Sequence, residues 1–303
     1  ILYASFAQQK MKYFVFALAF GFHSNSFHLY NISPRKSSDR KSSLCSDLPD
    51  SLQSSIEEIG RDVVEALKDG NKRLKIDYDT SLGDETYEPL QRAFPIVKAL
   101  LPLVVPNLET KEGGNFCLYL PDEGSAAMLR RDWKLGSEDS PLPKNVVTCG
   151  LKRTSLAESD VGCMVLCPRS SELDDFLRIL EELENTDKFI ILFNPELVDI
   201  MTTGYGLAGR RIRDLIQTNF VSLYCLKTLP WGALSKRYGK PFSLWVEDEA
   251  SEKGYRLLKN LDNKPAFDEM NEIYLEETGQ ASQENNPYSF LNGVADFIRD
   301  FGK

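Results

Sequence analysis

The chain has 303 residues, of which 42% are hydrophobic, 27% charged and 11% aromatic, and its formal net charge is −9. This balance is typical of a soluble globular protein with enough apolar material for a buried core. Both histidines, His23 and His28, lie near the N-terminus. If they are removed with a targeting segment, serine–histidine or cysteine–histidine catalysis and most zinc and iron sites are excluded for the rest of the chain.

Residues 1–46 are predicted to form a two-part targeting segment. From Met11 the sequence MKYFVFALAFGF places one lysine ahead of an apolar run of about ten residues, which is the order of a secretory signal peptide. The run is shorter than the ~20 apolar residues that span a bilayer. A serine-rich stretch with four basic residues and one acidic residue follows, as in a transit peptide. With the aromatic Phe27 at the junction, this order resembles the presequence of algal proteins delivered to a plastid acquired from another eukaryote.

Ordinary secretion followed by a basic arm is the alternative for this segment. A secreted protein would favour an even set of cysteines in a disulfide framework. Residues 47–303 instead carry five cysteines scattered along hydrophobic runs, which suits buried thiols: Cys117, Cys149, Cys163, Cys167 and Cys225. Without histidine or a second cysteine pair, this part of the chain is expected to hold no metal site.

The charge of the remaining chain limits its partners. Removing residues 1–46 leaves 30 basic and 44 acidic residues, a net charge of −14. A body this acidic, with no basic stretch in the linear sequence, is not expected to bind nucleic acid or an anionic membrane surface. The apolar segment FPIVKALLPLVV is interrupted by Lys98 and Pro102, so membrane contact is expected to be peripheral at most.

Helix-like and strand-like stretches alternate along residues 47–303. Residues 51–69 are predicted to form an amphipathic helix, because apolar residues recur three and four positions apart from Leu52 to Leu67, ahead of Gly70. Further helices are expected over residues 87–100, 123–133, 171–184, 207–220, 266–277 and 289–301. Strands are expected over KRLKIDYDT, NFCLYL, NVVTCGL, VGCMVLC, KFIILF and VSLYCL, with PFSLWVED and GYRLLKN as a closing pair.

This alternation predicts an α/β fold with a largely parallel sheet flanked by helices, a Rossmann-like three-layer arrangement. We expect a single domain over residues 47–277, followed by a polar linker and a C-terminal helix over residues 278–303. Two smaller lobes divided near residue 140 are the alternative.

The segment GYGLAGRRIRDL has the glycine spacing of a dinucleotide-binding loop. Such a loop needs its first glycine directly after a strand and a carboxylate about 20 residues later, to bind ribose. Here ten residues separate the strand KFIILF from Gly204, and Lys227 occupies the carboxylate region. The segment is therefore interpreted first as a loop and a solvated or ion-pairing helix face. A weak anion site is the alternative, built from Gly204, Gly206, Gly209, Arg210 and Arg213.

The order of several segments resembles DUF1995, a plastid and cyanobacterial domain of unknown function. The resemblance covers about residues 48–275 and rests on LPDSLQSSIEEIGRDVVEAL, GNKRLKIDYDT, ILFNP, FVSLYCLKTLPWG and SKRYGKPFSLWVED. In that family the domain stands alone in a chloroplast protein needed for photosystem II accumulation. It also forms the C-terminal part of a chloroplast adenylate kinase, whose phosphate loop is absent here. The family supplies no catalytic residues that could be transferred to this sequence.

The resemblance implies a plastid protein of the stroma or the thylakoid surface. We expect a non-enzymatic factor in photosystem assembly or maintenance, whose partners are photosystem subunits or other assembly factors. The alternative is a nucleotide or phosphometabolite binding module that uses the glycine–arginine segment. No catalytic residue, resident cofactor or metal is expected under the first of these two hypotheses.

Overall fold

The computed structural model of the chain describes residues 48–79, 89–108, 114–152, 155–198, 207–248 and 250–279. The targeting segment over residues 1–46 and the predicted helix over residues 289–301 lie outside this part. The helices are α2 (Leu52–Lys68), α3 (Pro89–Val104), α4 (Glu123–Asp132), α5 (Leu173–Leu183), α6 (Leu207–Asn219) and α7 (Phe267–Thr278). The strands are β1 (Arg73–Tyr78), β2 (Phe116–Leu120), β3 (Val146–Gly150), β4 (Gly162–Leu166), β5 (Phe189–Phe193), β6 (Val221–Leu229), β7 (Gly232–Lys236), β8 (Phe242–Glu247) and β9 (Tyr255–Leu261).

Helix α2 begins and ends where its sequence indicates. The Ser51 hydroxyl accepts a hydrogen bond from the Ser54 backbone N–H at 3.0 Å, and the Ser54 hydroxyl accepts one from the Ser51 N–H at 2.9 Å. This reciprocal pair satisfies two amides that the first helical turn leaves without partners. The chain then turns at Gly70, whose φ of 84° suits glycine. The predicted helix over residues 51–69 is confirmed.

Helix α3 extends beyond its predicted end at residue 100. It continues to Val104 and contains both Pro95 and Pro102. A proline inside a helix costs about 3 kcal/mol. The last turns bury Leu101 and Val104 almost completely, however, and each buried aliphatic side chain contributes about 1.5–3 kcal/mol. Burial therefore outweighs the proline penalty, which is why the predicted boundary was wrong.

The described strands form one nine-stranded sheet in the order β3-β2-β4-β5-β1-β6-β7-β8-β9. The first six strands in this order are parallel, and β7, β8 and β9 continue the sheet as antiparallel neighbours. Strand β2 lies between β3 and β4, so chain segments on both sides of residue 140 build the same sheet, contrary to the two-lobe alternative. The order also differs from the 3-2-1-4-5-6 order of dinucleotide-binding domains.

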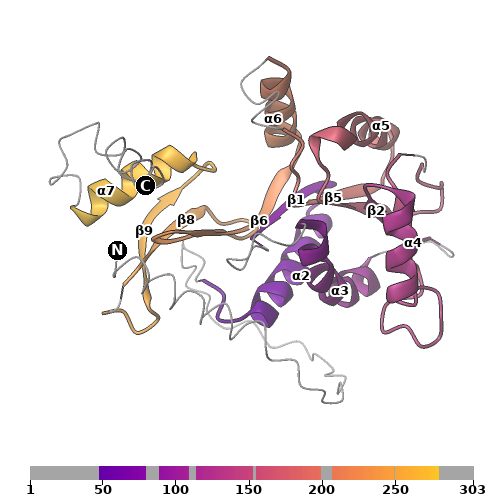
Figure 1. The fold of residues 1–303 in the computed structure, drawn as a ribbon, viewed down its shortest axis with the longest axis horizontal. Helices are drawn as coiled ribbons and strands as arrows, with labels where there is room; N and C mark the ends of the chain where they lie inside the picture. The colour runs from indigo at the N-terminus through magenta and orange to yellow at the C-terminus, as the bar shows by residue number, and fades with distance from the viewer. Residues whose placement is uncertain are drawn as a thin grey trace, which may run out of the picture.

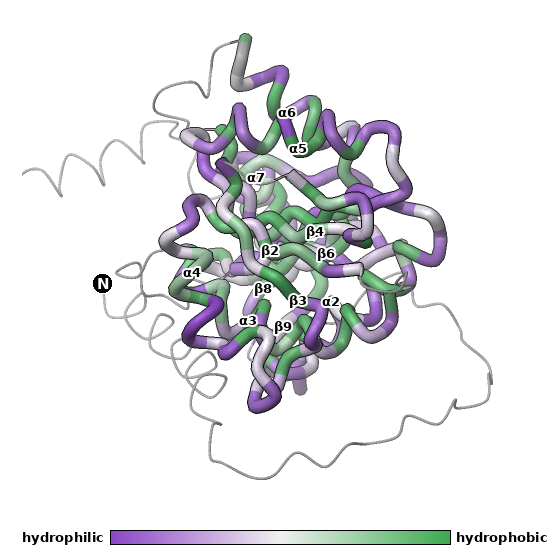
Figure 2. The backbone as a smooth tube through the Cα atoms, turned by 90° about the vertical axis from the view of Figure 1, so that its right-hand side faces the viewer, coloured by the Kyte–Doolittle hydropathy of each residue, from purple (hydrophilic) through white to green (hydrophobic). Residues whose placement is uncertain are grey.

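Alternate residues of the parallel strands face two separate cores. Leu74 and Ile76 of β1 pack with side chains of α2, α3 and α4, whereas Ile190 and Leu192 of β5 pack with side chains of α5 and α6. In Figure 1, α2 and α3 lie below the sheet while α5 and α6 lie above it. Figure 2 shows hydrophobic strands in the centre and hydrophilic stretches toward the outside. None of the helices in the described ranges is both long and apolar enough to cross a membrane.

Strand β7 was missed at the sequence level. Its sequence, GALSK, is short and contains glycine and serine, so it lacks the alternating apolar pattern of a strand. The pairing partner explains its conformation, because the indole Nε1 of Trp245 on β8 donates to the Ser235 hydroxyl at 2.9 Å. On the other face, apolar residues of β6, β7 and β8 form a third core with Met270 and Ile273 of α7.

One buried ion pair joins the antiparallel part of the sheet to α2. The Asp62 carboxylate is 4% exposed and accepts from the Arg237 guanidinium at 2.6 and 3.1 Å. The backbone N–H of Tyr238 donates to the same carboxylate at 3.2 Å, and Arg237 also contacts Glu58 at 3.3 Å. A bidentate pair of this kind fixes two elements in position as well as balancing a buried charge.

Replacing Arg237 with Met is expected to lower the free energy of unfolding by about 3–5 kcal/mol, because it leaves the Asp62 carboxylate buried beside no guanidinium. Urea denaturation measures the change. The matched control is Arg256→Met, which removes a half-exposed arginine whose Nε lies 3.5 Å from Asp248, and which should cost less than about 1 kcal/mol. Equal losses for the two variants would contradict the structural role given to Arg237.

Candidate functional site

The candidate site lies where two parallel strands end beside a third. Strands β5, β1 and β6 are neighbours, and a cleft opens at the carboxyl ends of β5 and β1, next to residues 225–227 in the second half of β6. After β1 the chain continues into α3, which packs in the first core, whereas after β5 it continues into α6, which packs in the second. The two connections therefore leave on opposite faces of the sheet. This is a topological switch point, where open α/β sheets bind their ligands.

The cleft has a volume of about 400 Å³, within the usual range for a small-molecule site. It draws side chains from the three strands, from the start of α3 and from the segment between β9 and α7. The described residues that line it are Asp77, Tyr78, Asp79, Pro89, Arg92, Asn194, Pro195, Glu196, Cys225, Leu226, Lys227 and Lys264. Acidic and basic groups both face this space, so it suits a polar molecule better than an apolar one.

Asn194 shapes the floor of the cleft. Its φ of 48° lies in the left-handed region, which Asn tolerates better than most residues. Its side-chain amide pairs with the backbone of Tyr78, since Oδ1 accepts from the Tyr78 N–H at 2.6 Å and Nδ2 donates to the Tyr78 carbonyl at 2.7 Å. The Asn194 side chain thus satisfies both backbone groups of Tyr78, as a neighbouring strand would do. The Asn194 main chain meanwhile turns away from the sheet.

A second residue with positive φ lies on the next strand. Cys167, directly after β4, has a φ of 45°, and its N–H donates to the Phe193 carbonyl at 2.8 Å. The Asn194 N–H in turn donates to the Ile76 carbonyl at 2.9 Å. Strained residues of this kind concentrate at functional sites, and here two follow adjacent strands at the same edge of the sheet.

Asp77 is the most strongly engaged charge in the cleft. Its Oδ2 lies 3.1 Å from Nζ of Lys75 and 2.7 Å from Nζ of Lys264. Burial alone would raise the pKa of Asp77, but the two ammonium groups outweigh burial and hold it below its usual value. Conversely, burial would lower the pKa of Lys264, and the Asp77 charge raises it. Both groups therefore stay ionised near neutral pH.

The remaining groups give the cleft a mixed chemistry. Burial raises the pKa of Cys225 to about 11, so this residue is a neutral thiol near pH 7. The Asp79 carboxylate accepts from the Thr228 N–H at 3.2 Å and from its hydroxyl. Lys227 and Glu196 are exposed at the rim. The arrangement can hold an anionic group beside the lysines and hydroxyl groups beside the carboxylates.

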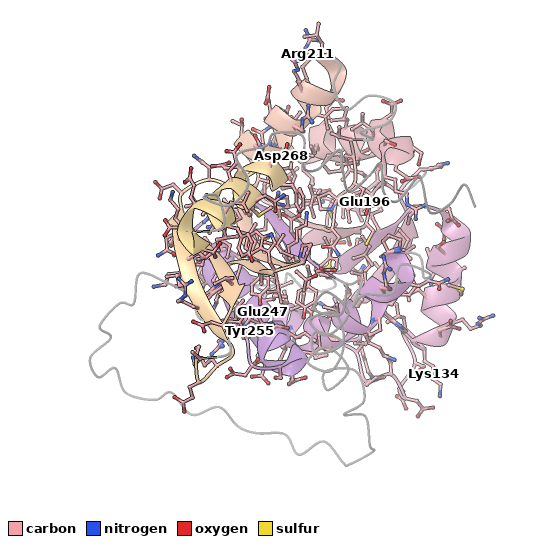
Figure 3. The ribbon with its side chains drawn as sticks, turned by 60° about the vertical axis from the view of Figure 1, so that its left-hand side comes forward. Lys134, Glu196, Arg211, Glu247, Tyr255 and Asp268 are labelled. Carbon is pink, nitrogen blue, oxygen red and sulfur yellow. The ribbon has the colours of Figure 1, made fainter. Side chains whose placement is uncertain are left out.

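The described residues of the glycine–arginine segment do not line this cleft. Gly204 and Gly206 lie outside the described residues, while Gly209, Arg210 and Arg213 belong to the first turns of α6. Figure 3 shows Arg211 at the outer end of α6, well away from Glu196 at the cleft. Whether the glycine–arginine segment binds an anion stays a prediction. In the described ranges, no group of three or more His, Cys, Asp or Glu residues is arranged to hold a metal ion.

Sequence reasoning did not select Asp77, Asn194 or Lys264 as site residues. A signal existed for the first two, because IDYD places an acidic residue near the end of a strand and ILFNP places an asparagine directly after one. Using it required knowing that β1 and β5 are neighbours, although 110 residues separate Tyr78 from Phe189. Lys264 carries no local signal, because it reaches Asp77 from a loop after the antiparallel strands.

Changing Asn194 to Asp is expected to lower the free energy of unfolding by about 1–3 kcal/mol near neutral pH, since a carboxylate oxygen would face the Tyr78 carbonyl without a proton to donate. A protonated carboxyl can donate there, so folding raises the pKa of the introduced group. The loss should therefore shrink as the pH falls, and be recovered most fully below about pH 4. Urea unfolding at a series of pH values measures this.

Asn271→Asp is the matched control for that variant. The Oδ1 of Asn271 accepts from Nε1 of Trp231 at 3.0 Å, a role that a carboxylate retains. This variant should stay close to the wild type near neutral pH and gain nothing on acidification. The same pH dependence in both variants would argue against the assigned bonds of Asn194.

Comparison with known proteins gives a family but no named relative. The chain matches no curated protein. Residues 49–272 match the family model described as "Domain of unknown function (DUF1995)". The matched span covers well over half of the chain and includes every strand of the sheet and the cleft at its carboxyl edge. The protein therefore belongs to the DUF1995 family.

Proposed function

We propose that the protein is a binding module whose cleft takes a small phosphorylated molecule, either a nucleotide or a phosphometabolite. The observation that carries the proposal is the convergence of cationic side chains on the switch point of the sheet. Arg92 comes from α3, Lys227 from β6 and Lys264 from the segment before α7. A phosphate group in the cleft would accept charge-assisted hydrogen bonds from these side chains.

The carboxylates of the cleft fit the same class of ligand. Lys75 and Lys264 balance the charge of Asp77, so it does not by itself repel an anion. Glu196 is exposed at the rim, where it would accept hydrogen bonds from ribose or sugar hydroxyls. We also propose that the parallel strands and the helices on their two faces form a Rossmann-like three-layer arrangement. It is supported by the placement of α3 and α6 in cores on opposite faces.

A binding role suits the residues that the chain offers. After His28 the sequence contains no imidazole to act as a general base near neutral pH. The thiol of the cleft, Cys225, has its pKa raised to about 11 by burial, which opposes a nucleophilic role. We therefore propose binding without bond making, with no resident cofactor or metal.

A thermal-shift screen against ADP, ATP, NADP, sugar phosphates and inorganic phosphate tests this function. A specific ligand at 100 times its dissociation constant should raise the free energy of unfolding by about 2.7 kcal/mol. Lys227→Ala, which removes an exposed charge at the rim, should weaken that ligand about tenfold, equivalent to about 1.4 kcal/mol. Lys264→Met should weaken it as well.

Lys144→Ala is the control, because this exposed lysine precedes β3 and so lies at the opposite edge of the sheet. If no ligand of the screen stabilises the protein at millimolar concentration, the proposal fails. If a ligand stabilises it but Lys227→Ala and Lys264→Met bind normally while Arg210→Ala and Arg213→Ala do not, the site is the glycine–arginine segment instead.

We further propose that the protein acts in the plastid as a factor in photosystem assembly or maintenance, at the stroma or the thylakoid surface. Membership of the DUF1995 family and the two-part targeting segment over residues 1–46 support this role. Its partners would be photosystem subunits or other assembly factors.

Expression of a C-terminally tagged chain in a plastid-bearing alga tests the second proposal. The full chain should enter the plastid, and removal of residues 1–46 should abolish import. Affinity purification should then recover photosystem II subunits or assembly intermediates in amounts above those from a tagged stromal control protein. Secretion of the full chain, or a plastid fraction that yields no photosystem component, would contradict the proposal.

A further inference from the structure

Two exposed helix faces of opposite charge lie on the same side of the sheet. Leu192 of β5 belongs to the core under α6, and Cys225 of β6 belongs to the core under α7. Leu192 is the register partner of Lys75 on β1. Cys225 is the register partner of Asp77, two residues further along the same strand. Register partners, and residues two apart on one strand, point to the same face. The two helices therefore cover one face of the sheet, where Figure 1 shows them apart from each other.

The outer face of α6 is basic around one exposed leucine. Leu207, at the start of the helix, is 75% exposed. Arg210 and Arg211 follow it by three and four positions, so they lie on the same side of the helix, and both are exposed. Residues 207–213 contain three arginines and no acidic residue. The outer end of α6 therefore presents an apolar side chain between two cations.

The outer face of α7 is acidic around another exposed leucine. Leu275 is 40% exposed. Asp268 and Glu272 precede it by seven and three positions, so they lie on the same side of the helix, and Glu276 follows Glu272 by four. All three carboxylates are exposed. The helix contains five acidic residues and no basic one. It therefore presents an apolar side chain among anions.

The two faces complement each other. A single exposed apolar side chain needs no partner. In the described ranges, however, three of the four exposed large hydrophobic side chains lie on these two helices, namely Leu207, Phe267 and Leu275. Each leucine is surrounded by charges opposite to those around the other. Since one chain carries both faces, a second copy of the chain offers the complement to each of them.

The charge of the whole chain makes the basic face important for such a contact. Residues 47–303 carry a net charge of −14, so two copies repel each other over most of their surface. The arginines of α6 reverse this repulsion where they face the carboxylates of α7. Figure 3 shows Arg211 and Asp268 on these two helices, and Lys134 at the opposite end of the molecule.

We propose that two copies of the chain form a dimer with two-fold symmetry, in which α6 of each copy packs against α7 of the other. Leu207 then contacts Leu275 of the second copy, while Arg210 and Arg211 face its acidic residues. A two-fold axis brings the same pair of faces together twice, so neither face is left to bind a third chain. The dimer does not depend on the ligand proposed for the cleft.

Sedimentation of the full chain over a range of concentrations tests the proposal first. The chain should reach the mass of a dimer and no larger mass. Raising the ionic strength from about 0.1 M to about 1 M shortens the Debye length from about 10 Å to about 3 Å, so the dissociation constant of the dimer should rise. This measurement requires no substitution, so it decides the question even if a variant does not fold.

Charge reversals then identify the two faces. Arg210→Glu combined with Arg211→Glu makes both faces acidic, and Glu272→Arg combined with Glu276→Arg makes both basic. Each double variant alone should dimerise at least about 100-fold more weakly, because like charges would face each other across the interface. An equimolar mixture of the two double variants should form a heterodimer, since each of its two contacts then joins a basic face to an acidic one.

Arg131→Glu combined with Lys134→Glu is the matched control. Both residues are exposed, and they lie at the end of α4, which packs in the core on the opposite face of the sheet. This variant should dimerise like the wild type. A wild-type chain that stays monomeric at its highest soluble concentration, or that forms larger assemblies, would overturn the proposal. So would a dimer that either double variant leaves unchanged, or a mixture of the two that stays monomeric.

Discussion

The cleft depends on two hydrogen bonds from one side chain. Strand β1 lies between β5 and β6, and its last residue, Tyr78, would lose its neighbour on the β5 side where the chain turns away. The Asn194 amide supplies that neighbour with bonds of 2.6 and 2.7 Å, while its own backbone adopts a positive φ. The backbone pairing of β1 with β5 therefore ends where the chain turns at Asn194, and the Asn194 side chain takes over the pairing with Tyr78. Because of this, the strands separate into a cleft without leaving backbone groups unsatisfied.

The antiparallel strands contribute to the same site. They carry the chain to Lys264, whose ammonium group lies 2.7 Å from Asp77 on the central strand β1. The Asp62–Arg237 pair fixes the β7–β8 connection against α2, so the extension is held from a second direction. One ion pair therefore links β1 to the segment after the antiparallel strands, and the other, which is more buried, links α2 to the β7–β8 connection. A buried pair is weak evidence for stability by itself, but here each joins elements distant in the sequence.

The sequence allowed most helices and strands to be predicted, but their boundaries and their positions in the sheet could be predicted only in part. Local signals were sufficient for α2, where the serine pair and Gly70 mark both ends, and for the continuous apolar runs of β4 and β5. They failed for α3, because the burial that carries it past Pro102 is a tertiary effect. They also failed for β7, whose polar side chains are explained by the Trp245 indole on the next strand.

The site itself was the least predictable feature. The glycine–arginine segment attracted attention because its spacing is a familiar local pattern, whereas Asp77, Asn194 and Lys264 are brought together only by the strand order. The sequence by itself does not reveal the strand order, in which β1 lies between β5 and β6. Cys117 and Cys163 are likewise register partners only because β2 and β4 are neighbours.

Hydrogen exchange of the backbone amides, with and without the ligand that stabilises the protein most, tests the central claim directly. The account predicts that binding slows exchange at the ends of β1 and β5 and within β6, around residues 77–79, 194–196 and 225–227. Slowed exchange confined to α6, with the three strands unchanged, would contradict it and place the ligand at the glycine–arginine segment.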